Sequence, residues 1–79
     1  MENFEILRMT IANILRIDKD QIDENSSQDN IENWDSLAIV NMVTELEKVF
    51  NVQFDILEIV EFYSVEIIKL TLIDKGIKF

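Results

Sequence analysis

The sequence contains no cysteine, no histidine and no proline, and it has one glycine among 79 residues. Without cysteine, the chain can form neither a disulfide framework nor a thiol nucleophile of its own. Without proline, and with so little glycine, it lacks the residues that most often break helices and form tight turns. Because 48% of the residues are hydrophobic, the chain is too apolar to be disordered. These features together favour an all-α fold.

The length of the chain leaves room for one domain, which we expect to span residues 1–79 as a monomer. No apolar run approaches the roughly 18 residues that a membrane span needs. Glu2 and Glu5 stand where a signal peptide would carry basic residues. We therefore expect a cytoplasmic protein that does not span a membrane.

Positive charge is scarce, since seven basic residues face sixteen acidic ones and the net charge is −9. A field of this sign repels phosphate backbones, so nucleic acid is not an expected partner. It attracts proteins with basic docking surfaces and speeds their encounter. The same charge could also serve only to keep a small protein soluble.

Hydrophobic periodicity predicts four helices, over residues 2–16, 36–50, 56–62 and 65–75. Ser64 is the predicted N-cap of the last helix, and Gly76 lies at its left-handed stop position. The residues expected to face the core are Phe4, Leu7, Ile11, Ile14, Leu15, Ile39, Met42, Val43, Leu46, Val49, Phe50, Ile59, Val60, Phe62, Val65, Ile68 and Leu72. Ile67, Leu70 and Ile73 lie off the inward stripe of the last helix, which predicts either a large core contact or a self-association surface.

The connection over residues 17–35 has no helical pattern and is strongly acidic. Its acids are Asp18, Asp20, Asp23, Glu24, Asp29, Glu32 and Asp35, against the single base Lys19. We expect Ile22 and Ile31 to fasten this loop to the helices and Trp34 to be a half-buried anchor. A calcium loop starting at Asp18 is not predicted, because its sixth position holds Asp23 where the sharp turn needs glycine. No metal site is expected, and a solvated acidic loop is the better reading.

The stretch Trp34-Asp35-Ser36-Leu37 opens the second predicted helix. Asp35 or Ser36 can act as its N-cap, because a short side-chain oxygen can accept from the first free N–H groups. Leu37 falls opposite the apolar stripe of this helix, on the side of Asn41. A hydroxyl thus lies at the positive end of a helix dipole, beside an apolar side chain that the core cannot use.

Together with the length, the acidity, the four-helix spacing and the pattern Leu46-Glu47-x-x-Phe50, this stretch resembles the acyl carrier protein family. The resemblance covers nearly the whole chain and runs from Trp34 to Phe54 without a gap. It implies a four-helix bundle with a long loop between the first two helices and a short third helix. In this family the serine of Asp-Ser-Leu carries a 4′-phosphopantetheine arm, which here implies Ser36, with Asp35 and Leu37 beside it.

The resemblance also implies a carrier function, in which the arm holds acyl or aminoacyl groups as thioesters between enzymes of fatty acid, specialised-metabolite or surface-glycan synthesis. The implied partners are a phosphopantetheinyl transferase and acyl-loading and acyl-transferring enzymes with basic docking surfaces. The implied docking residues are Leu37, Val40, Asn41, Glu45 and Glu47, and the acyl-chain lining would be Leu46, Phe54, Ile59, Phe62 and Ile68. Ala38, Asn41 and Lys48 depart from the acids usual in carriers of primary fatty acid synthesis, which favours a specialised pathway.

Two other functions are compatible with parts of the pattern. Asp-Ser-Leu also occurs in serine hydrolases, but there a glycine precedes the aspartate, where this chain has Trp34. A serine hydroxyl needs a base to become a nucleophile, and the chain has no histidine. We therefore do not expect an enzyme. The remaining alternative is an acidic helical adaptor that docks a basic partner and is never modified.

Overall fold

The computed structural model describes residues 2–79, and the regular elements of this part are all helices. Its elements are α1 (Glu2–Leu15), the short 3-10 helix η1 (Lys19–Gln21), α2 (Ser36–Phe50), α3 (Ile56–Ile59) and α4 (Val65–Asp74). Within the described residues, strand-like pairing is limited to one isolated bridge between Ser27 and Ser64. The all-α prediction is confirmed.

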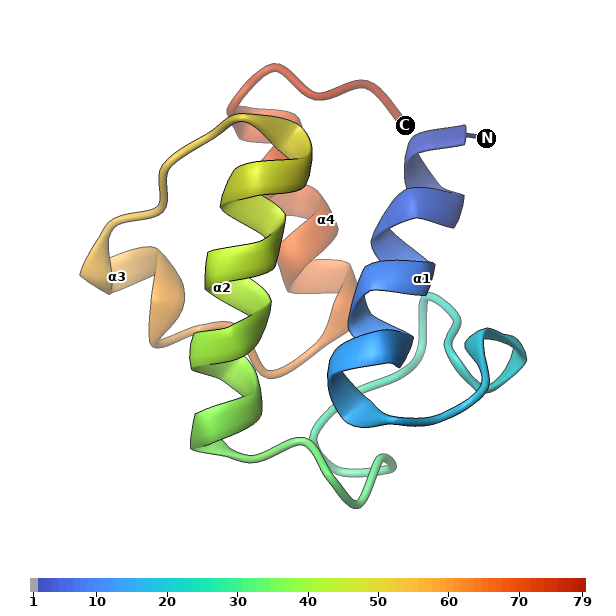
Figure 1. Cartoon of the computed structure of the whole chain (residues 1–79). Coiled ribbons are helices and arrows are strands. Elements are labelled where there is room, and N and C mark those ends of the chain that lie inside the picture. Colours follow the sequence, from blue (N-terminus) through green and yellow to red (C-terminus); the bar gives the residue numbers. More distant parts are fainter. Residues whose placement is uncertain (1) are drawn as a thin grey trace.

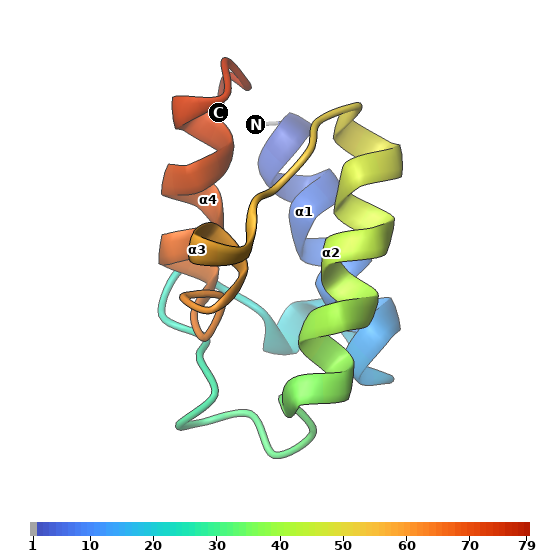
Figure 2. The same cartoon turned by 90° about the vertical axis from the view of Figure 1, so that its left-hand side faces the viewer.

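Three long helices form the body of the molecule, and the short α3 lies across the side made by α2 and α4 (Figures 1 and 2). The connection from α1 to α2 wraps around one end of the bundle. The segment after α4 crosses the other end and returns to the start of α1 (Figure 1). There the side-chain amide of Asn3 donates to the backbone carbonyl of Lys78 at 2.7 Å.

The core lies between α1, α2 and α4. Its buried hydrophobic members are Leu7, Ile11, Ala12, Leu15, Ile22, Trp34, Ala38, Met42, Val43, Leu46, Phe54, Phe62, Val65, Ile68 and Leu72. Phe4, Ile14, Ile39, Phe50 and Ile59 are partly buried and pack against this cluster. Most of the predicted core is therefore confirmed. Leu70 and Ile73 of α4 are exposed, so the core covers only part of that helix.

Two residues predicted to be buried are exposed. Val49 in α2 is 45% exposed, because the contact with the other helices is narrower than the stripe predicted from the sequence. Val60 is 66% exposed, because α3 ends at Ile59 and Val60 is its C-cap. The third helix is thus a single turn rather than the predicted 56–62. Phe62 reaches the core from the connection that follows it.

The helix ends are set by side chains of the connections. α1 ends at Leu15, one residue earlier than predicted, and Arg16 takes a left-handed conformation with φ 60°. The Asn33 side-chain amide donates to the Leu15 carbonyl at 3.0 Å, which satisfies one of the free carbonyls at this end. The predicted cap of α4 is confirmed, since the Ser64 hydroxyl accepts from the Ile67 N–H at 3.1 Å. Gly76 has φ 95°, as a left-handed stop requires.

The connection between α1 and α2 is firmly attached to the bundle. Ile22 is fully buried and Ile31 partly buried, which confirms both as anchors. Trp34 was predicted to be half-buried, but it is only 2% exposed. Its indole N–H donates to the buried carbonyl of Phe62 at 3.1 Å, a partner distant in sequence that the local pattern could not reveal. Tryptophan can be buried completely where its N–H finds an acceptor, as here.

Two of the seven loop acids form ion pairs in the described structure. Glu24 lies 2.7 Å from the Lys69 ammonium, and Asp20 lies 3.9 Å from the Arg8 guanidinium. The residues described include no group of three or more His, Cys, Asp or Glu side chains that could hold a metal ion. Over the same residues, every helix is too short or too polar to cross a membrane.

Raising the ionic strength from about 0.01 to about 0.1 M should raise the melting temperature, because the Debye length then falls from about 30 to about 10 Å. Most of the acids over residues 18–35 would repel one another less. If screening raises the free energy of unfolding by about 1 kcal/mol, the melting temperature should rise by about 4–8 °C. Thermal melts across this range, with millimolar Mg²⁺ as a second series, measure the effect. A flat or falling midpoint would show that the ion pairs of Asp20 and Glu24 outweigh the repulsion.

Candidate functional site

The start of α2 leaves the Ser36 hydroxyl free. Asp35 is the N-cap, since its extended backbone precedes the helix and its carboxylate accepts from the Ala38 N–H at 2.9 Å. Ser36 is therefore the first residue of α2, and the choice between the two caps is settled in favour of Asp35. The Ser36 side chain is exposed, and its hydroxyl has no hydrogen-bond partner among residues 2–79.

This hydroxyl suits modification by another protein better than catalysis. The first turn of α2 contains no acidic residue, and the nearby Asp35 carboxylate is engaged with Ala38. The chain has no histidine that could take the serine proton. In contrast, a phosphodiester at this position would lie at a helix N-terminus, where free N–H groups and the dipole favour negative charge. The residues present thus fit a phosphopantetheine arm on Ser36.

The outer face of α2 carries exposed apolar and polar side chains beside Ser36. Leu37 is 69% and Val40 57% exposed, and Asn41 is exposed as well. Glu45 is partly exposed and pairs with Lys48 at 3.6 Å. The structure therefore places these four of the five predicted docking residues where a partner can reach them.

Glu47, the fifth, has a different role in the fold. One of its carboxylate oxygens accepts from the Phe54 N–H at 3.0 Å, and the residue is partly buried. Glu47 thereby holds the connection between α2 and α3 against α2. The family resemblance implied that Glu47 belongs to the docking face with Glu45, but a carboxylate engaged with the backbone is less available to a partner.

A hollow of about 300 Å³ lies between the start of α2 and the end of α1. It is lined in part by Arg16, Asn33, Leu37, Ala38 and Asn41. Sequence reasoning did not find Arg16 or Asn33 as neighbours of the site, because only the fold brings the end of α1 to this place. Ala38 is buried there, at one of the positions where carriers of primary fatty acid synthesis usually have an acid.

The residues predicted to line an acyl chain lie together between α2, α3 and α4, and we call this set (Leu46, Phe54, Ile59, Phe62 and Ile68) the seam. Four of them are buried and Ile59 is partly buried. The rings of Phe54 and Phe62 meet edge to face with their centroids 4.9 Å apart. The seam residues are therefore part of the tightly packed core, and their role as an acyl-chain lining stays a prediction.

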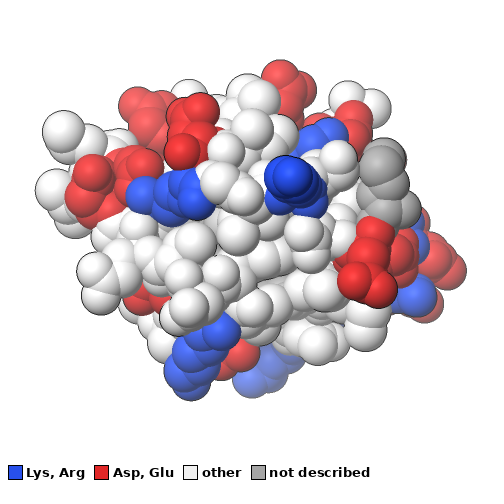
Figure 3. All heavy atoms as spheres, turned by 90° about the horizontal axis from the view of Figure 1, so that it is seen from above, with Lys and Arg blue, Asp and Glu red and all other residues white. Residues whose placement is uncertain are grey.

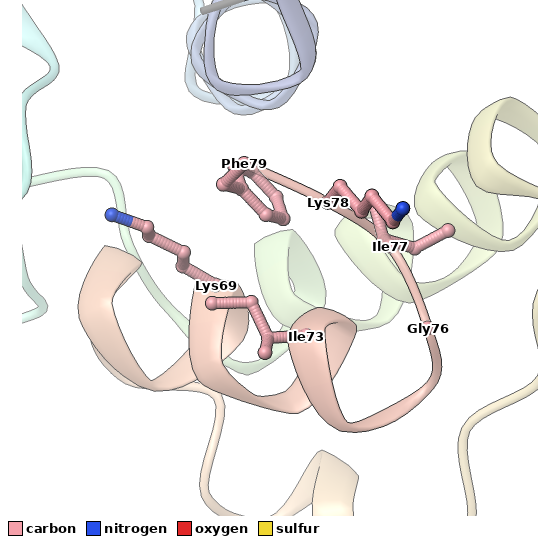
Figure 4. Close-up of a pocket in the computed structure, with 6 residues that line it drawn as sticks. All are labelled: Lys69, Ile73, Gly76, Ile77, Lys78 and Phe79. Carbon is pink, nitrogen blue, oxygen red and sulfur yellow. The ribbon is translucent and has the colours of Figure 1, made fainter.

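A second, wider hollow of about 640 Å³ lies at the end of the bundle away from Ser36. It is formed by the last turns of α4 and the segment after it, with Ile73, Ile77 and Phe79 around it (Figure 4). Seen from this end, lysine or arginine side chains lie beside an uncharged region (Figure 3). Lys69 on its rim is already engaged, since its ammonium pairs with Glu24 and lies 5.9 Å from the centroid of the Phe79 ring.

Comparison with known proteins agrees with the resemblance read from the sequence. Residues 5–66 match the family model described as phosphopantetheine attachment site. Among solved structures, the fold is similar to the solution NMR structure of a holo acyl carrier protein from Nitrosomonas europaea, with a TM-score of 0.80 and 28% sequence identity. The alignment covers 96% of this chain and 98% of that chain. A search of curated protein sequences gave no significant match.

The family match covers most of the chain and includes the start of α2 with its free hydroxyl. The predicted four-helix bundle, with its long first connection and short third helix, is confirmed by the structural similarity. Members of this family are carriers and not enzymes, and they interact with phosphopantetheinyl transferases and acyl-handling enzymes. The chain belongs to the phosphopantetheine attachment-site family, within the acyl carrier proteins, and its prosthetic group is phosphopantetheine.

Proposed function

We propose that this protein carries acyl or aminoacyl groups as thioesters on a 4′-phosphopantetheine arm attached to Ser36. The observation that carries the proposal is the exposed Ser36 hydroxyl. This hydroxyl makes no hydrogen bond within residues 2–79, and Ser36 directly follows the N-cap Asp35. The arm supplies the thiol that the chain lacks. Ser36 supplies the attachment oxygen, and the start of α2 supplies a field that favours the phosphodiester.

The outer face of α2 is the proposed docking surface for the transferase and for acyl-handling enzymes. Leu37 and Val40 offer an apolar contact, while Asn41 offers a polar one. Glu45 and the overall charge of −9 would steer partners with basic surfaces toward this face. Glu47 stays in the proposed surface as an acidic neighbour, although its carboxylate also holds the Phe54 N–H.

The pathway that we propose is a specialised one, such as specialised-metabolite or surface-glycan synthesis. Ala38 and Asn41 are neutral where carriers of primary fatty acid synthesis usually have acids, and Lys48 reverses a charge. Ala38 has no carboxylate to offer a partner, and its side chain is buried, which supports a different set of partner enzymes. A monomer acting in the cytoplasm remains part of this proposal.

Incubation with coenzyme A, Mg²⁺ and a broad-specificity phosphopantetheinyl transferase should add one phosphopantetheine per molecule. Intact-mass measurement before and after the reaction gives the result directly. A protein that stays unmodified with several competent transferases would contradict the proposal. That outcome would favour the unmodified acidic adaptor, whose binding to basic proteins could then be measured.

A further inference from the structure

The seam must open if it is to take an acyl chain, since its residues already pack against one another. Leu46, Phe62 and Ile68 have no exposed surface, so separating α2 from α4 would uncover fully buried side chains. α3 has no fully buried residue, since Ile56 and Leu57 face solvent and Ile59 is only partly buried. Because the cost of opening rises with the apolar area uncovered, α3 is the element that moves most easily.

Polar contacts of Glu58 add to the partly buried Ile59 in holding α3 in place. One carboxylate oxygen of Glu58 accepts from the Asp55 N–H at 3.0 Å and lies 2.9 Å from the ammonium of Lys75, the C-cap of α4. The Asp55 N–H bond and the Lys75 ammonium hold the pKa of Glu58 below its ordinary value, so this carboxylate is charged at neutral pH. The side chains of Glu58 and Lys75 are about three-quarters buried, with 26% and 22% of their surface exposed.

The same ammonium also covers the aromatic part of the seam. Lys75 Nζ lies 5.5 Å from the centroid of the Phe54 ring, which in turn packs edge to face on Phe62. An ammonium at this distance is attracted to the face of the ring. Lys75 therefore links α4, α3 and the aromatic pair at one point, and losing its ammonium would release its contacts with Glu58 and with the Phe54 ring together.

We propose that the Glu58–Lys75 ion pair is a latch that positions α3 over Phe54 and Phe62 and sets how readily an acyl chain enters the seam. The proposal rests on the proposed carrier function. The chemistry of the seam also selects which class of acyl group is taken inside. The seam side chains are all apolar, so an unsubstituted alkyl chain fits them. The ammonium of an aminoacyl group would find no partner among them, and such a group would stay outside.

The test compares the wild type with Glu58→Gln and Lys75→Met. Glutamine at position 58 can still accept from the Asp55 N–H, so this variant keeps the helix cap while it loses the ion pair. Lys75→Met removes the ammonium and leaves an apolar side chain. Lys75→Arg should keep the latch. Lys19→Met is the matched control, because it removes an ammonium that pairs with Glu5 at 3.5 Å and is remote from α3 in sequence and contacts.

Two measurements are made on each variant. Amide hydrogen exchange over residues 56–61 of the unmodified protein reports the opening of α3, and it should be about two- to fivefold faster in both latch variants. The protein is then loaded from ω-fluoro-octanoyl coenzyme A by the transferase, and the fluorine NMR shift reports the buried fraction of the chain end. The ratio of buried to exposed chain should rise by the same factor in the latch variants.

Combining Glu58→Gln with Lys75→Met should add little to Lys75→Met alone, because that change already breaks the ion pair. Unchanged exchange in the latch variants, or an equal rise in Lys19→Met, would overturn the proposal. Faster exchange with an unchanged fluorine signal would also overturn it, since the chain would then enter without α3. If loading itself fails, intact mass shows that the proposed function is at fault, and the exchange of the unmodified protein still decides the latch.

Discussion

Replacing Ser36 with alanine is expected to abolish attachment of the phosphopantetheine arm while leaving the fold about as stable as the wild type. The Ser36 oxygen is the proposed acceptor, so its removal leaves the transferase without a nucleophile. The hydroxyl makes no hydrogen bond within residues 2–79, and the cap of α2 is provided by Asp35. Because alanine is the best helix former, the thermal midpoint should change little. Intact mass and a thermal melt of the same sample measure both effects.

Ser64→Ala is the matched control, since Ser64 also stands at the start of a helix. Its hydroxyl accepts from the Ile67 N–H, so its loss should cost about 0.5–2 kcal/mol of stability. The arm should nevertheless be attached as in the wild type. The two serines thus separate a modification site from a structural cap. Modification of Ser36→Ala would contradict the assignment and direct attention to the other serines of the chain.

The helices could be predicted because their apolar residues recur with the helical period and their ends carry recognisable caps. Ser64 and Gly76 act locally, and each has the role that the sequence indicated. Burial was harder to predict, because it depends on which other element covers a side chain. Val49 and Val60 fit the local pattern, yet both side chains are exposed. Trp34 is buried because a carbonyl 28 positions away accepts its N–H.

The candidate site shows the same division between local and long-range information. Ser36, Leu37 and Val40 could be assigned from one short stretch, because a helix fixes their relative directions. The structural role of Glu47 could not be assigned in this way, because its hydrogen bond with the Phe54 N–H depends on how the connection after α2 folds back. Arg16 and Asn33 line the hollow beside Leu37 because the long connection between α1 and α2 brings them there. The Glu58–Lys75 pair likewise joins two helices whose packing the sequence pattern did not specify.

Leu37→Ala should separate docking from folding, because this side chain is 69% exposed on the outer face of α2. Its removal should cost the fold well under the 2–5 kcal/mol that is typical of a buried Leu→Ala change. The same side chain stands next to Ser36, where any transferase must approach. Truncating an apolar residue at the centre of a contact commonly costs about 1–2 kcal/mol, which corresponds to roughly 5- to 30-fold in kcat/KM for loading.

Leu46→Ala provides the opposite case on the same helix. Leu46 is fully buried, so the free energy of unfolding of this variant should fall by about 2–5 kcal/mol. That is a large part of the total stability of a small domain, which is about 5–15 kcal/mol. Per folded molecule, however, it should be loaded at nearly the wild-type rate, because its outer face is unchanged. Thermal melts and initial loading rates, corrected for the folded fraction, test both variants. If Leu37→Ala melts like a core variant and loads normally, Leu37 belongs to the core, and the outer face of α2 is not the docking surface.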